Sequence, residues 1–218
     1  MRFRIRALKT TEADVFGASA HEFVLAPPLA EHEVAGAEAQ WGISFPEDYR
    51  AFLLEAGAGG AGPYYGLFPL RRIGGRWVWE GDGGDMVSAP EKPWRHDEKW
   101  NLDGHPIRDA EPTEEDPRFD YESFEEAWEE WNEKFETIYW DPKWTEGAIC
   151  LCHEGCALRN WLVVTGSRRG EIWWDGTADG RGLSPRTTAD GKPMHFRAWY
   201  LEWLDRCERP HRGEDVCC

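Results

Sequence analysis

Apolar side chains recur every three or four residues in several parts of the chain, and this spacing is typical of amphipathic helices. The clearest of these predicted helices spans residues 120–139 and ends before Pro142. It begins either at Asp120 or at a capping box formed by residues 123–126. Five residues form its apolar stripe: Phe124, Trp128, Trp131, Phe135 and Ile138. We expect this stripe to face the core, because burial of an apolar face stabilises most protein helices.

Three further helices are predicted from the same spacing. One spans residues 29–41 and ends at Gly42, as helices often do at a glycine. The next starts at Pro46, a residue suited to the first helical position, and continues to about residue 56. The last carries a stripe near the end of the chain: Phe196, Trp199, Tyr200, Trp203 and Leu204.

Other apolar runs predict strands. Residues 2–7 alternate charged and apolar side chains, which predicts an edge strand with Phe3 and Ile5 on one face. Further strands are expected at 77–79, 148–153, 161–165 and 171–175, with a hairpin turn over 166–170. This order of helices, strands and a closing helix predicts an α+β fold in which an antiparallel sheet packs with helices.

The length of 218 residues fits one domain. We expect an N-terminal arm over residues 1–28, a single domain over 29–205 and a loose tail over 206–218. Within that domain we expect an insertion at about 76–146, made of a loop and the acidic helix. The Gly- and Pro-rich segment 81–117 is predicted to be a long surface loop.

The net charge of the chain narrows the classes of partner that it is expected to bind. It has 41 acidic and 25 basic side chains, a net charge of −16. Such a chain repels nucleic acid phosphates and anionic lipid headgroups, so we expect no nucleic acid and no membrane partner. No apolar run approaches the roughly 18 residues of a membrane span. Residues 1–6 also lack the apolar stretch of a signal peptide, so we expect a cytoplasmic protein.

Much of the negative charge lies in one segment. Residues 109–136 hold thirteen acidic and two basic side chains. Seven glutamates lie opposite the apolar stripe of the predicted helix or beside that face: Glu122, Glu125, Glu126, Glu129, Glu130, Glu133 and Glu136. Their three- and four-residue spacings are repulsive, so folding gains nothing from them. Two interpretations stay open: an ordinary solvated helix face, and a binding site for a basic protein, for which these glutamates are the candidate residues.

The cysteines suggest a metal site only weakly. Cys150, Cys152, His153 and Cys156 place four potential zinc ligands within seven residues, but common zinc sites separate two ligand pairs by a dozen residues or more. Strand alternation also places Cys150 and Cys152 on one face and His153 on the other. We therefore expect a buried pair of thiols, free cysteines throughout, and no metal or other cofactor.

No motif indicates catalysis. The glycine-dense segment 57–62 follows a predicted helix and lacks the Gly-Lys-Ser/Thr ending of a phosphate-binding loop, so it is predicted to be a turn. The seven histidines show no fixed spacing with a nucleophile. The chain is also rich in tryptophan, with 14. Four of them lie in or beside predicted loops and could anchor an interface or pack the loops onto the body: Trp94, Trp100, Trp140 and Trp144.

Several segments resemble the SUKH superfamily, named for yeast cell-wall-assembly regulators of the Smi/Knr type. Residues 38–53 show an acidic residue and a helix end, then Gly42-Ile43, Pro46-Glu47-Asp48-Tyr49 and Phe52-Leu53. Segments similar to the bacterial branch follow in order: 59–67, 155–156, 161–166, 172–175 and 196–204. Segment 76–146 matches no part of the pattern.

The resemblance implies an α+β fold without catalysis. Bacterial members of the superfamily are regarded as immunity proteins that neutralise toxins, many of them nucleases. A basic toxin suits an acidic inhibitor, although the resemblance assigns no binding residue. Two alternatives remain: a housekeeping scaffold or regulator of the same fold, and a metal-dependent enzyme using the Cys150–Cys156 cluster.

Overall fold

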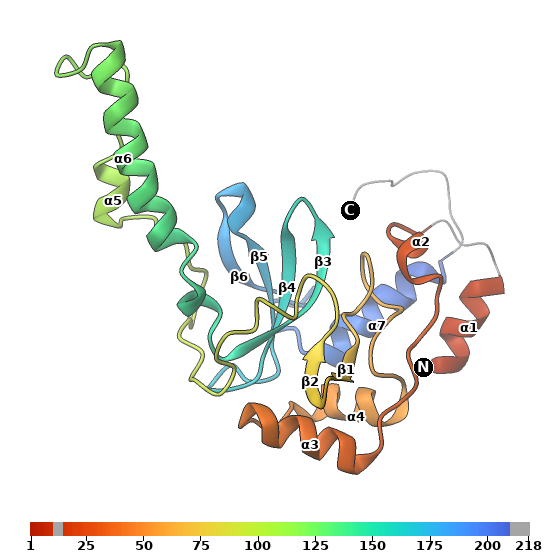
Figure 1. Ribbon diagram of the computed structural model, residues 1–218. Coiled ribbons are helices and arrows are strands. Elements are labelled where there is room, and N and C mark those ends of the chain that lie inside the picture. The colour runs from red at the N-terminus through yellow and green to blue at the C-terminus, as the bar shows by residue number, and fades with distance from the viewer. Residues whose placement is uncertain (11–14, 210–218) are drawn as a thin grey trace.

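The computed structural model describes residues 1–10 and 15–209 and shows the predicted α+β fold (Figure 1). The main sheet is an antiparallel meander in the order β3-β4-β5-β6. Its strands are β3 (Ala148–Gly155), β4 (Leu158–Val163), β5 (Ile172–Gly176) and β6 (Gly182–Pro185). A separate hairpin pairs β1 (Leu70–Ile73) with β2 (Arg76–Trp79).

Three of the predicted helices form the main core with one face of the sheet. They are α3 (Glu31–Trp41), α4 (Glu47–Glu55) and α7 (Phe196–Cys207). Gly42 adopts φ 66° at the end of α3, which confirms the predicted glycine stop. Aromatic rings of α4 and α7 interlock, with Phe52 and Tyr200 5.0 Å apart. The hydroxyl of Tyr200 donates to the carbonyl of Ala61, which fixes the glycine-dense turn against α7.

The opposite face of the sheet is covered by a segment that was predicted to be a surface loop. Trp94 is only 7% exposed and packs edge-on against Trp173 of β5, with ring centroids 5.1 Å apart. Leu102 is also buried, and a short helix, α5 (Pro106–Asp109), follows it. The prediction for 81–117 was therefore partly wrong, because the sheet presents apolar side chains on both faces and needs a second cover.

The N-terminal residues form a helix instead of the predicted edge strand. Helix α1 (Arg2–Thr10) buries Ile5 and Leu8, which lie three residues apart on one helical face, and leaves Phe3 84% exposed. Arg4 anchors α1 to α7 through ion pairs with Asp205 and Glu208. The alternation of arginine with apolar residues was misleading because only one apolar residue of residues 1–6 enters the core.

Helix α6 (Tyr121–Tyr139) extends away from the rest of the fold, and its first turns lie farthest from the sheet (Figure 1). Three short elements complete the described chain: α2 (Ala18–His21), η1 (Pro142–Thr145) and η2 (Thr177–Asp179). Most of the predicted tail, together with Cys217 and Cys218, lies outside the described residues, whereas α7 continues to Cys207.

Candidate partner-binding surface

The first turn of α6 is fixed by a reciprocal cap. Asp120 accepts a hydrogen bond from the backbone N–H of Ser123 at 2.9 Å, and the Ser123 hydroxyl oxygen accepts one from the backbone N–H of Asp120. A hydrogen bond from the Ser123 hydroxyl to the Asp120 carboxylate, together with the bond from the Ser123 N–H, lowers the pKa of this carboxyl. Of the two predicted starting points, Asp120 is thus the one used. It satisfies backbone groups that would otherwise lack partners at this isolated helix end.

The second half of α6 is held by neighbouring segments. The indole of Trp131 donates to the carbonyl of Ile107 at 2.7 Å, and the guanidinium of Arg108 lies 4.6 Å from the centre of the Phe135 ring. The indole of Trp144 donates to the carbonyl of Ile138 at 2.7 Å. Helix α5 and the segment after α6 therefore cover this part of the apolar stripe.

All seven predicted glutamates are exposed on α6. Glu130 pairs with Lys134 at 2.6 Å, and this hydrogen bond lowers the pKa of Glu130. None of the other six forms an ion pair with any residue that the structure describes. Their charges lie on a helix that extends away from the rest of the fold (Figure 1).

The first half of the stripe is not buried, which corrects the expectation that Trp128 is a core residue. Trp128 is 41% exposed, and Phe124 is only partly buried. Together with Glu125 and Glu129 these residues line a hollow of about 140 Å³. The helical spacing of the apolar residues did not predict this hollow. The signal was the preceding segment 109–119, in which Phe119 is the one large apolar side chain available as a cover.

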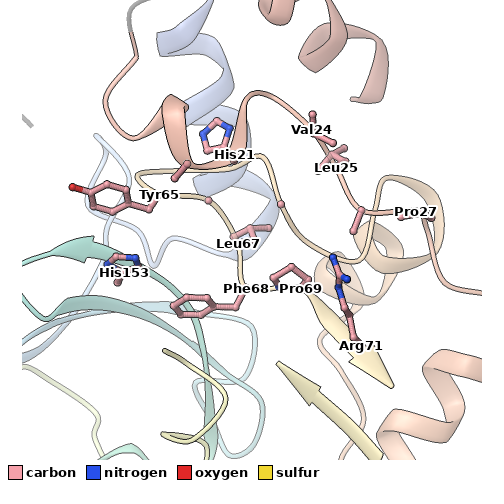
Figure 2. A pocket seen from close by; sticks show the side chains of 14 residues that line it. His21, Val24, Leu25, Pro27, Tyr65, Leu67, Phe68, Pro69, Arg71 and His153 are labelled. Carbon is pink, nitrogen blue, oxygen red and sulfur yellow. The ribbon is translucent and has the colours of Figure 1, made fainter. Parts of the chain in front are cut away.

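A larger hollow of about 450 Å³ lies between the N-terminal segment, the glycine-dense turn and β3 (Figure 2). His153 stacks with Tyr65 and Phe68 along one side, with ring centroids 4.7 and 6.0 Å apart, while Val24 and Leu25 line the other. The described lining includes neither a carboxylate nor a thiol. The lining combines apolar side chains with two imidazoles and the guanidinium of Arg71.

His21 is a buried part of the same lining. Its Nδ1 accepts the backbone N–H of Phe23 at 3.0 Å, and its ring packs edge-on against Trp203. Burial lowers the pKa of His21 to about 4, so the imidazole is neutral at neutral pH. This arrangement links residues 21–23 to α7 and gives His21 a packing role.

The burial of the two thiols is confirmed, but their predicted placement on one face of the sheet was wrong. Cys150 and Cys152 are both buried, but a bulge in β3 shifts the register between them. Cys150 therefore joins the cluster with Trp161, and Cys152 joins the main core on the opposite face. Burial raises the pKa of both thiols, that of Cys152 to about 12. Across the described residues, no group of three or more potential ligands is placed to hold a metal ion.

The loop tryptophans divide between packing and exposure. Trp94 is buried, and Trp100 packs against Trp144 with ring centroids 4.4 Å apart. Trp140 is 52% exposed at the end of α6. Three of the four thus pack, and Trp140 is left on the surface. The four cysteines in the described chain are free, as expected.

A model of the SMI1/KNR4 family (SUKH-1) matches residues 28–189, which is well over half of the chain. Searches of curated proteins and of solved structures found no match. Within residues 1–10 and 15–209, none of the helices combines the length and apolar character needed to cross a membrane. The family match confirms the resemblance that the motifs indicated.

Proposed function

The chain belongs to the SMI1/KNR4 (SUKH-1) family, and we propose that it is a non-catalytic immunity protein that neutralises a basic protein toxin. SUKH proteins are generally immunity proteins, which supports this class of function. The observation that carries the choice of a basic partner is the row of unpaired glutamates on α6.

Physical reasoning supports α6 as the binding element. Unpaired like charges on one helix repel one another, and a cationic partner relieves that repulsion while it gains attraction. The projection of the helix lets a partner approach from several sides (Figure 1). A toxin that grips nucleic acid phosphates has a basic surface, and the carboxylates of α6 present comparable negative charge. Association through this face is expected to be fast and sensitive to salt.

The first experiment is affinity capture from the native cell with the full-length protein as bait. The expected partner is a basic protein that is toxic when expressed alone and harmless when co-expressed with this chain. Capture of a partner without toxicity would contradict the immunity role and favour the housekeeping scaffold.

The binding face is tested with two matched variants. Glu126→Gln, Glu129→Gln and Glu133→Gln combined are expected to weaken toxin binding about tenfold at low salt and to flatten its salt dependence. The control removes the same charge from exposed positions on the body that form no ion pair within the described chain, by Glu55→Gln, Glu91→Gln and Glu98→Gln combined. Equal losses in both variants would show a general charge effect, and unchanged affinity in the first would exclude the α6 face.

A further inference from the structure

The apolar stripe of α6 extends farther than the segments that cover it. Helix α5 contacts the stripe through Ile107 and Arg108, which reach Trp131 and Phe135. One and two turns earlier, Trp128 and Phe124 form the walls of the 140 Å³ hollow. Within the described chain, the indole nitrogen of Trp128 has no hydrogen-bond partner and its ring packs against no other aromatic ring. The exposed indole face of Trp128 is thus available to another molecule.

The covered part of the same region shows which group these aromatic rings accept. Arg108 lies over Phe135 with its guanidinium carbon 4.6 Å from the ring centre. Just after α6, Trp144 receives two cations, Lys143 at 4.5 Å and Arg95 at 5.6 Å. Cations over aromatic rings therefore recur along α6 and the segment that follows it. Trp128 offers the best ring type for such contacts and has no cation over it in the described chain.

The charge around the hollow selects the occupant. Glu125 and Glu129 line it together with the two aromatic residues, and neither forms an ion pair within residues 1–10 and 15–209. A second copy of the chain would bring its own negatively charged α6 against this one. An apolar side chain from another protein would leave both carboxylates without a cationic partner. Arginine fits both features, because its planar guanidinium stacks on indole while its N–H groups donate to carboxylates.

We propose that the hollow between Phe124 and Trp128 is an arginine-binding site for a protein partner, with the guanidinium stacked on Trp128 and paired with Glu125 and Glu129. This inference rests on the proposed function and specifies it, because it names the partner side chain that α6 recognises. The remaining glutamates then attract the partner from a distance, whereas Trp128 supplies the local contact that distinguishes arginine from other cations.

The test follows the tryptophan indole N–H signals of the full-length, ¹⁵N-labelled protein by NMR. Trp128→Phe and Trp140→Phe each remove one signal and so assign it, and Trp140 serves as the exposed tryptophan outside the hollow. The probe is an acetylated Gly-Arg-Gly amide. The comparison probe replaces arginine with citrulline, which has nearly the same shape and no charge.

We expect the Trp128 signal to shift saturably with the arginine peptide, and the Trp140 signal to stay in place. Citrulline should cause little shift, and Glu125→Gln combined with Glu129→Gln should weaken arginine binding about fivefold. A stationary Trp128 signal at millimolar peptide would overturn the inference. So would an equal response to citrulline, or parallel movement of the Trp128 and Trp140 signals.

The outcome is separable from that of the proposed function, because the peptide titration requires no toxin. Arginine binding at Trp128 combined with capture of a non-toxic basic partner would retain the site and reject the immunity role. Once a toxin is captured, Trp128→Ala is expected to weaken binding about tenfold and Trp140→Ala less than twofold. Neutralisation with equal affinity in both variants would retain the immunity role and reject the arginine site.

Discussion

Helices α6 and α7 carry the same kind of apolar stripe, but only α7 buries all of it. The five stripe residues of α7, Phe196 to Leu204, are each at most 9% exposed. In α6, Trp131 is the one buried member of the predicted stripe, and Trp128 is 41% exposed. Helical spacing therefore identifies the apolar face of a helix, whereas its burial depends on the cover that other segments supply.

The polar faces of the two helices differ in the same direction. On α7, Asp205 pairs with Arg4, and Glu202 pairs with Arg206. On α6, six of the seven glutamates lack such partners in the described chain. Helix α7 thus buries its whole apolar stripe, whereas α6 is covered over its second half only and carries six glutamates without an ion pair in the described chain. This contrast is why we assign stability to α7 and propose recognition as the role of α6.

The largest expected difference between the two helices appears when one tryptophan is removed from the apolar stripe of each. Trp199 is 5% exposed in α7, so Trp199→Ala should lower the free energy of unfolding by about 3–5 kcal/mol through lost packing and a cavity. Trp128→Ala on α6 should change it by less than about 0.5 kcal/mol. Urea unfolding of both variants measures the difference. Equal losses would show that the α6 stripe is part of the cooperative core.

Acid should destabilise the surroundings of α7 through His21. The ordinary pKa of histidine near 6.5 is lowered to about 4 by burial beside Trp203, so the unfolded chain binds this proton first as the pH falls. Above about pH 6.5 the free energy of unfolding is not reduced by this titration. As the pH falls towards 4, it decreases by up to about 3 kcal/mol.

Urea unfolding at a series of pH values tests this assignment. His21→Asn keeps an acceptor for the N–H of Phe23 and removes the titration, so its stability should fall less steeply over the same range. Burial also lowers the pKa of His96. A smaller dependence of the free energy of unfolding on pH therefore remains in both the unmodified protein and the His21→Asn variant. Parallel pH profiles would show that His21 does not control the acid response.

Elements marked by a local sequence pattern could be predicted from sequence. The spacing of α6 and α7, Gly42 at the end of α3 and the strands β3, β4 and β5 are local patterns that the fold retains. Helix α1 was mistaken for a strand because its arginines alternate with apolar residues, although Ile5 and Leu8 are the pair that reaches the core. The strands β1 and β6 are four residues each and depend on their neighbours, which spacing does not reveal.

The candidate site was predictable in its charge but not in its shape. Glutamate spacing placed the carboxylates on the outside of a helix, and their exposure follows from that pattern. The hollow at Trp128 depends on what the segment before α6 fails to cover, which is a tertiary property. The positions of Cys150 and Cys152 on opposite faces depend on a bulge that alternation does not show.

The smallest expected effect concerns how the two helices begin. Asp120 caps α6 with its side chain, whereas His195 precedes α7 without a side-chain cap. Asp120→Ala should therefore cost about 1 kcal/mol of local helix stability. It should appear as faster hydrogen exchange in the first turns of α6 at nearly constant global stability, because few contacts attach those turns to the body. His195→Ala should leave exchange in α7 unchanged. Slower hydrogen exchange in α6 than in α7 of the unmodified protein would contradict the contrast between the two helices, in which a side-chain cap holds the start of α6 and core packing holds α7.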